Sequence, residues 1–185
     1  MQLTGQQTLP VSQDKAWAAL NDTALLQASI PGCESLTASA DNEYDALIVA
    51  AIGPVKAKFK GKLKLSEINA PNSYTMNFEG QGGPAGHGKG SAKVRLEPNG
   101  ANETVLHYEA NASVGGKIAQ IGSRLVDMAA QKMAGEFFES FNAKLQEQYG
   151  IVAALEAAEA EEPQGFVSRI VAWIKRLFGG SAKAQ

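Results

Sequence analysis

The sequence contains few of the residues from which metal centres and disulfides are built. Its 185 residues include one cysteine, Cys33, and two histidines, His87 and His107. A single cysteine cannot form an internal disulfide, and these three side chains offer too few ligands for an iron–sulfur cluster or a zinc site. We therefore expect no metal and no covalent cofactor. Neither histidine has an acid or base at a motif spacing that would make it catalytic.

Long apolar runs and an excess of charge are also missing. No stretch of about 20 apolar residues is present, so no segment is expected to cross a bilayer as a helix. The formal net charge is −2, which argues against nucleic acid as a partner, because phosphate binding needs a concentrated basic surface. The N-terminus lacks the charged and apolar regions of a signal peptide, and we expect a cytoplasmic protein.

The residues that are present alternate between apolar and polar over much of the chain. This period of two predicts about seven strands, most clearly in "PVKAKFKGKLKLSEI", residues 54–68. Two short helices are predicted near residues 12–20 and 22–29, and one long helix from Gly116 to Tyr149. We expect an α+β fold in which a curved antiparallel sheet wraps round the long C-terminal helix.

Five lysines, from Lys56 to Lys64, occupy every second position of that clearest strand. A row of lysines on one strand face most often prevents strands of different molecules from pairing. The same row could also meet an acidic partner protein or anionic lipid.

A glycine-rich stretch at residues 80–90 resembles a phosphate-binding loop. P-loops and dinucleotide fingerprints both need a helix directly after the glycines, because the helix N-terminus holds the phosphate. Here the glycines lead into "SAKVRLEP", whose alternation predicts a strand. We therefore predict a tight turn at Gly83–Gly86 between two strands, and no binding of ATP or NAD.

Four separated motifs resemble one protein family. They are "IPGCESL" at 30–36, "GPVKAKFKGKLKLSEI" at 53–68, "GPAGHGKGSAKVRL" at 83–96 and "VGGKIAQIGSRLVDMAAQKMAGEFFESF" at 114–141. In this order they resemble the CoxG family, the G subunit of carbon monoxide dehydrogenase, which belongs to the START-like (SRPBCC) helix-grip superfamily. The resemblance covers about residues 1–147 and implies a START-like domain over residues 1–149.

The resemblance also implies a function. Such a protein would be an accessory to a molybdenum hydroxylase of the carbon monoxide dehydrogenase type. It would work between that enzyme and the membrane by carrying a quinone. It would hold no molybdenum, flavin or iron–sulfur site of its own.

A helix-grip fold encloses an apolar cavity between sheet and helix, which suits a hydrophobic ligand. On this expectation the wall residues on the helix are mid-sized, whereas Phe137, Phe141 and Leu145 form packed core. The alternative is that the whole apolar stripe is core. The ligand-binding residues expected are Ile30, Cys33, Phe59, Met76, Phe78, Tyr108, Ile118, Ile121, Leu125 and Met128.

The C-terminal segment has a different composition. Residues 150–165 are rich in glutamate and end in proline and glycine, which predicts a flexible acidic linker. Residues 166–178 predict an amphipathic helix of about 20 Å, too short to cross a bilayer but able to lie in its interface. A helix that docks on protein is the alternative, and residues 179–185 are an expected disordered tail. The predicted membrane-binding residues are Phe166, Arg169, Ile170, Trp173, Ile174, Lys175, Arg176 and Leu177.

These features favour a membrane-tethered binding protein over an enzyme. The first hypothesis is a cytoplasmic protein, peripheral on the cytoplasmic membrane, that binds a quinone and links the dehydrogenase to the respiratory chain. The second is a recruitment or assembly factor that docks the dehydrogenase at the membrane without a ligand. The third is a START-like cyclase or hydrolase, which would need a polar constellation inside the cavity.

Deleting residues 163–185 is expected to release the protein from membranes and to leave the domain folded. Trp173→Glu should have the same effect on binding, because it places a charge in the apolar face of the predicted helix. Liposome co-sedimentation of the full-length, truncated and Trp173→Glu proteins measures this. Equal partitioning of all three would show that the segment is not an anchor.

Overall fold

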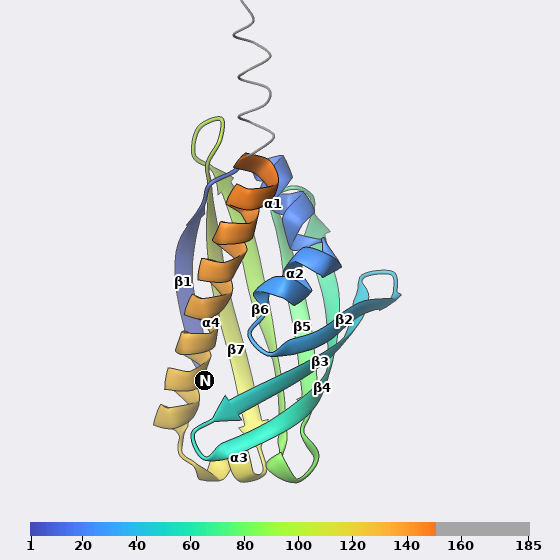
Figure 1. The fold of residues 1–185 in the computed structure, drawn as a ribbon, viewed down its shortest axis with the longest axis vertical. Coiled ribbons are helices and arrows are strands. Elements are labelled where there is room, and N and C mark those ends of the chain that lie inside the picture. Colours follow the sequence, from blue (N-terminus) through green and yellow to red (C-terminus); the bar gives the residue numbers. More distant parts are fainter. Residues whose placement is uncertain (151–185) are drawn as a thin grey trace, which may run out of the picture. The chain divides into compact units, whose positions relative to one another are not determined.

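The structure is a computed structural model that describes residues 1–150. The chain forms a single antiparallel sheet with helices on its inner face (Figure 1). The predicted linker, amphipathic helix and tail lie outside the described residues, apart from Gly150. Residues 1–149 form one compact unit.

The seven strands lie side by side in the sheet in their order along the chain, except that the first lies beside the last. They are β1 (Gln2–Leu9), β2 (Cys33–Ala40), β3 (Glu43–Ile52), β4 (Val55–Asn69), β5 (Ser73–Gln81), β6 (His87–Pro98) and β7 (Thr104–Gly115). Their order in the sheet is β1-β7-β6-β5-β4-β3-β2, and every neighbouring pair is antiparallel. The predicted curved antiparallel sheet is confirmed.

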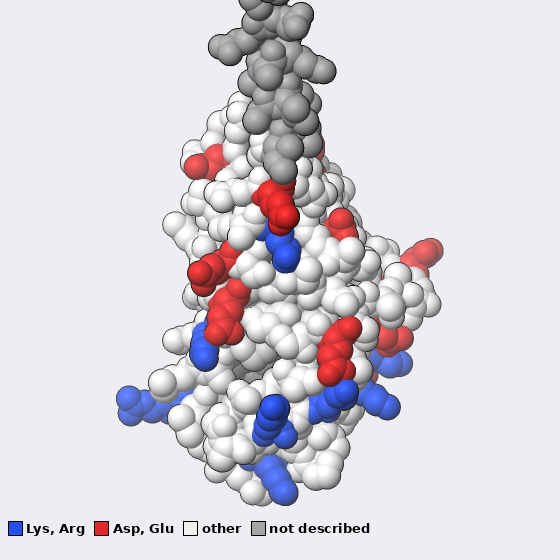
Figure 2. Space-filling model, in the orientation of Figure 1, with Lys and Arg blue, Asp and Glu red and all other residues white. Residues whose placement is uncertain are grey.

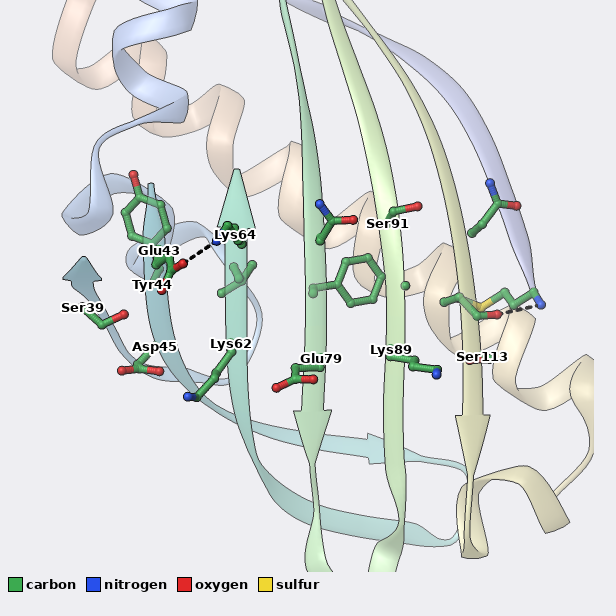
Figure 3. A pocket seen from close by; sticks show the side chains of 17 residues that line it. Ser39, Glu43, Tyr44, Asp45, Lys62, Lys64, Glu79, Lys89, Ser91 and Ser113 are labelled. Carbon is green, nitrogen blue, oxygen red and sulfur yellow. Dashed lines mark hydrogen bonds and ion pairs between the residues drawn. The ribbon is translucent and has the colours of Figure 1, made fainter. Parts of the chain in front are cut away.

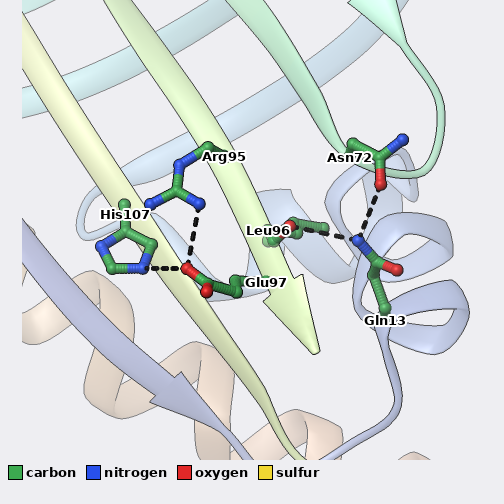
Figure 4. Close-up of polar contacts among 6 residues, drawn as sticks. All are labelled: Gln13, Asn72, Arg95, Leu96, Glu97 and His107. Carbon is green, nitrogen blue, oxygen red and sulfur yellow. Dashed lines mark hydrogen bonds and ion pairs between the residues drawn. The ribbon is translucent and has the colours of Figure 1, made fainter. Parts of the chain in front are cut away.

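Two short helices, α1 (Gln13–Leu20) and α2 (Thr23–Ser29), connect β1 to β2. Asp22 caps α2, because its carboxylate accepts hydrogen bonds from the backbone N–H of Ala24 at 2.9 Å and of Leu25 at 3.1 Å. At the start of α1, the Gln13 side chain donates to the Leu96 carbonyl oxygen and to Asn72 Oδ1, each at 3.1 Å (Figure 4). The contact of Gln13 with Leu96 ties α1 to β6.

The predicted long helix is interrupted near its start. The structure has a short helix α3 (Lys117–Gln120), then a break at Ile121 and Gly122, then the long helix α4 (Ser123–Leu145) and a π-helical turn η2 (Gln146–Gly150). Gly122 has a φ of +95°, a left-handed conformation that glycine adopts without steric cost. The prediction of one continuous helix from Gly116 was therefore wrong at this point.

The glycine-rich stretch is a hairpin, as predicted. Gly83–Ala85 form a single 3₁₀ turn, η1, that joins β5 to β6. The strand that follows excludes the helix N-terminus that a P-loop or dinucleotide fingerprint would require.

The core is concentrated where the C-terminal half of α4 meets the ends of β1, β6 and β7. Leu9, Leu106, Phe141 and Leu145 are each at most 2% exposed there. The Thr104 hydroxyl, fully buried, donates to the Val11 carbonyl oxygen at 2.9 Å. Further along the sheet the inward residues of β4, from Val55 to Leu65, are only half-buried, whereas the lysines between them are exposed. The sheet is thus larger than the core that covers it.

Candidate functional site

An apolar cavity of about 440 Å³ lies between the inner face of the sheet and the helices. This volume is within the range of about 300–1,000 Å³ that is usual for small-molecule sites. The helices α1, α2 and α4 contribute to its wall, together with inward residues of all seven strands. The lining residues are Leu3, Leu20, Leu26, Ile30, Pro31, Leu36, Tyr44, Leu63, Leu65, Tyr74, Met76, Phe78, Ala92, Val94, Leu106, Tyr108, Met133, Ala134, Phe137 and Phe138.

The strand register explains why these side chains meet. Tyr44, Leu63 and Phe78 lie directly opposite one another on β3, β4 and β5. Tyr74, Val94 and Tyr108 form a second such row on β5, β6 and β7. Between these two rows, Met76 lies opposite Ala92. Residues opposite one another in neighbouring strands point to the same face of a sheet, so the three rows form a continuous apolar floor.

Aromatic stacking closes one end of the cavity. The rings of Tyr108 and Phe138 stack with centroids 5.3 Å apart, and Phe137 stacks on Phe141 at 5.4 Å. Phe141 is fully buried beyond them, within the core. The cavity therefore ends where the packed core begins.

Among the described residues that line the wall, three tyrosine hydroxyls are the only side-chain groups that contain oxygen or nitrogen. They belong to Tyr44, Tyr74 and Tyr108, and none of them makes a hydrogen bond within residues 1–150. Burial raises the pKa of Tyr74 well above its ordinary value, and the neighbouring Tyr44 raises it further. Tyr74 is thus a neutral hydrogen-bond donor throughout the physiological pH range.

No lining residue is an acid or a base of the kind that hydrolysis or general acid–base catalysis uses. Residues 1–150 also contain no group of three histidine, cysteine or acidic side chains placed to hold a metal ion. What the arrangement can do chemically is to surround an apolar molecule and donate hydrogen bonds to it.

Four of the ten predicted ligand-binding residues line the cavity: Ile30, Met76, Phe78 and Tyr108. The other six lie outside it. Ile118 is 2% exposed, whereas Leu125 and Met128 on the first turns of α4 are 44% and 56% exposed. Cys33, Phe59 and Ile121 are half-buried, and burial raises the pKa of the Cys33 thiol.

The helical part of the wall lies further along α4 than the sequence analysis placed it. Met133, Ala134, Phe137 and Phe138 face the cavity, so Phe137 is a wall residue rather than packed core. Counting back from the buried Phe141 in steps of three and four leads to Phe138, Ala134, Ala130 and Val126. This apolar periodicity is present in the sequence, but before residue 137 the predicted apolar stripe followed a different face of the helix.

A second hollow, of about 870 Å³, is a polar trough on the outer face of the sheet (Figure 3). Asp45, Lys62, Glu79 and Lys89 follow one another across β3 to β6, with charges of alternating sign. Lys64 Nζ donates to Glu43 Oε1 at 2.7 Å, which lowers the pKa of Glu43. This wet, charged surface does not suit an apolar ligand.

Both histidines lie away from the cavity, on or beside the outer face. His107 is 3.3 Å from Glu97 Oε2, which also accepts a hydrogen bond from Arg95 at 2.9 Å (Figure 4). Arg95 chiefly, with His107, holds the pKa of Glu97 below its usual value. His87 begins β6 beside the glycine turn.

Comparison with known proteins places this chain in a family. A model of the family described as the G subunit of carbon monoxide dehydrogenase (CoxG) matches residues 5–146. The chain belongs to the CoxG family. No curated protein sequence matches it significantly.

Solved structures with the same fold include START proteins. A conserved protein from Geobacillus kaustophilus is 28% identical, with a TM-score of 0.75, over 80% of this chain and 96% of that one. A START superfamily protein from Mycobacterium smegmatis is 11% identical, with a TM-score of 0.62, over 79% and 97%. The Zhui aromatase/cyclase from a Streptomyces species is 12% identical, with a TM-score of 0.60, over 80% and 95%. The helix-grip fold of this CoxG-family chain is thus confirmed.

Within residues 1–150, no helix is long and apolar enough to span a bilayer.

Filling the cavity is expected to cost little stability. Ala92 is 8% exposed and its side chain points into the cavity, so Ala92→Phe should lower the free energy of unfolding by less than about 1 kcal/mol, because the ring enters empty space. Ala16 is fully buried in the packed core, and the matched Ala16→Phe should cost about 1–3 kcal/mol or more. Urea unfolding measures both, and equal losses would show that the cavity is not open space.

Proposed function

We propose that this CoxG-family protein binds a hydrophobic ligand, most simply a quinone, in the cavity between sheet and α4. The single observation that carries the proposal is the composition of the wall: twenty residues, none charged, with three tyrosine hydroxyls. A quinone is an apolar ring with two carbonyl oxygens, which accept hydrogen bonds but donate none. Tyrosine hydroxyls in an apolar wall match that chemistry.

Tyr74 is the donor best suited to a ligand carbonyl. Its hydroxyl has no hydrogen-bond partner within residues 1–150, and its raised pKa keeps the proton on the oxygen. A carbonyl-bearing ligand in the cavity would give this hydroxyl the acceptor that it lacks among residues 1–150. Its ring is fixed by an edge-on contact with Trp17, whose centroid is 5.7 Å away.

The remainder of the proposal rests on family membership and on the sequence. The family description names carbon monoxide dehydrogenase, and we propose a molybdenum hydroxylase of that type as the partner. The protein would act as an accessory without chemistry of its own, bound to the inner face of the cytoplasmic membrane through residues 166–178. It would carry reducing equivalents towards the respiratory chain by means of its bound quinone.

A ligand-free recruitment or assembly factor is the competing function, and ligand binding separates the two. Trp17 is a built-in reporter, because it touches Tyr74 at the cavity wall. The chain has one other tryptophan, Trp173, which Trp173→Phe removes. Quenching of Trp17 fluorescence by a short-chain naphthoquinone then measures binding in solution.

In this assay Tyr74→Phe is expected to weaken quinone binding by about 2- to 12-fold, the equivalent of a net hydrogen bond of about 0.5–1.5 kcal/mol. The matched control is Tyr149→Phe, because Tyr149 lies beyond α4, beside Lys15, and does not line the cavity. Equal affinities of the two variants would remove Tyr74 as the donor. Absence of saturable quenching in the parent protein would favour the ligand-free recruitment factor.

A further inference from the structure

Three parts of the chain that are distant in sequence meet at one end of the sheet. They are the β3–β4 turn, the turn η1, and the helix α3 with the first turn of α4 (Figure 1). A Cβ atom built on Gly53 would lie 3.7 Å from Cδ1 of Ile121 and 3.9 Å from Cδ1 of Leu125. A Cβ atom on Gly116 would lie 2.6 Å from the Cα atom of Gly86, so these turns are in direct backbone contact.

Basic residues predominate at this end. Residues 52–60, 82–90 and 114–128 contain six basic residues and one acidic residue, Asp127. Glu34 pairs with Lys58, and Glu79 lies opposite Lys89 in the strand register. We call it the basic end, and its basic residues are Lys56, Lys58, Lys60, Lys89, Lys117 and Arg124. All six are exposed, and among the described residues only Lys58 has an ion-pair partner, Glu34 at 2.7 Å.

The opposite end of the domain carries the other sign. There, residues 9–20, 96–104 and 139–149 contain five acidic and two basic residues. Figure 2 shows basic side chains gathered at the lower end of the domain and acidic side chains over its middle and upper parts. Such a charge separation orients a molecule in the field of a charged surface.

Exposed apolar side chains lie within the basic end. Leu125 and Met128, on the first turns of α4, are two of only four large apolar residues exposed within residues 1–150. They are next to Arg124 on α4, and Leu125 contacts the β3–β4 turn. Exposed apolar side chains with basic neighbours are typical of surfaces that bind to the bilayer interface.

We propose that the basic end docks the domain on an anionic lipid bilayer, with Leu125 and Met128 entering the interface. The proposal deepens the proposed function, on which it rests for the idea that the ligand is a membrane lipid. The six cations meet the anionic headgroups, and the acidic opposite end turns away from them. Charge complementarity selects an anionic surface, and the apolar pair selects a bilayer over a purely polar acidic protein.

The test uses the full chain carrying Trp173→Glu, so that the C-terminal segment contributes little. Lys117→Glu with Arg124→Glu should lower partitioning onto phosphatidylcholine vesicles containing phosphatidylglycerol by about tenfold or more, since each basic residue near such a surface adds about a factor of five. Both positions are in the first turn of a helix, where glutamate is favourable, so the fold is retained.

The matched control is Lys93→Glu with Lys144→Glu, which changes the net charge equally but away from the basic end. It should reduce partitioning much less. A second variant, Leu125→Ser with Met128→Ser, leaves the charge unchanged and should also weaken binding, with the residual binding abolished by high salt.

Equal partitioning of the test and control charge variants would overturn the proposal. Loss with the charge variant but none with the serine variant would instead indicate a purely electrostatic contact, as with an acidic protein, and would also overturn it. Fluorescence titration with a naphthoquinone separates this result from the proposed function. If the test and control variants bind quinone normally but partition equally onto vesicles, the protein has the ligand site without this docking surface.

Discussion

The structure depends on how much of a curved sheet one helix can cover. The C-terminal half of α4 packs Phe138, Phe141 and Leu145 against the ends of β1, β6 and β7, and there the inner face is fully buried. No element of comparable size within residues 1–150 covers the middle of the sheet, so the inward side chains of β3 to β6 surround a cavity. The packed end supplies the stability that allows the rest of the inner face to remain hollow.

Polarity is divided strictly between the two faces of the sheet. The alternation of apolar and polar residues places Leu63, Met76 and Phe78 on the inner face and the charged side chains of the same strands on the outer one. An apolar molecule can therefore enter only the inner face without losing hydration of charges. Within residues 1–150, the tyrosine hydroxyls are the polar side-chain groups of the cavity wall that can orient a ligand.

The sequence was sufficient for the fold because its signals were local. Alternation over β4 and β7, the Asp22 cap and the strand after the glycine turn each follow from neighbouring residues. The cavity wall was predicted less well, because it depends on the rotation of α4 about its axis. Leu125 and Met128 are apolar but lie outside the buried stripe of α4 that passes through Val126 and Phe138, and they are exposed. Tyr74 shares a strand face with Met76 and Phe78 by alternation, whereas the place of Tyr44 follows only from the strand register.

The four methionines offer the most direct test of where the ligand binds. Met76 and Met133 line the cavity, Met1 borders the outer trough, and Met128 is exposed at the start of α4. With ¹³C-labelled methionine methyl groups, each site gives its own NMR signal during titration with a short-chain naphthoquinone. The account predicts that the Met76 and Met133 signals shift while those of Met1 and Met128 do not. Shifts of Met1 or Met128 with Met76 and Met133 unchanged would contradict it.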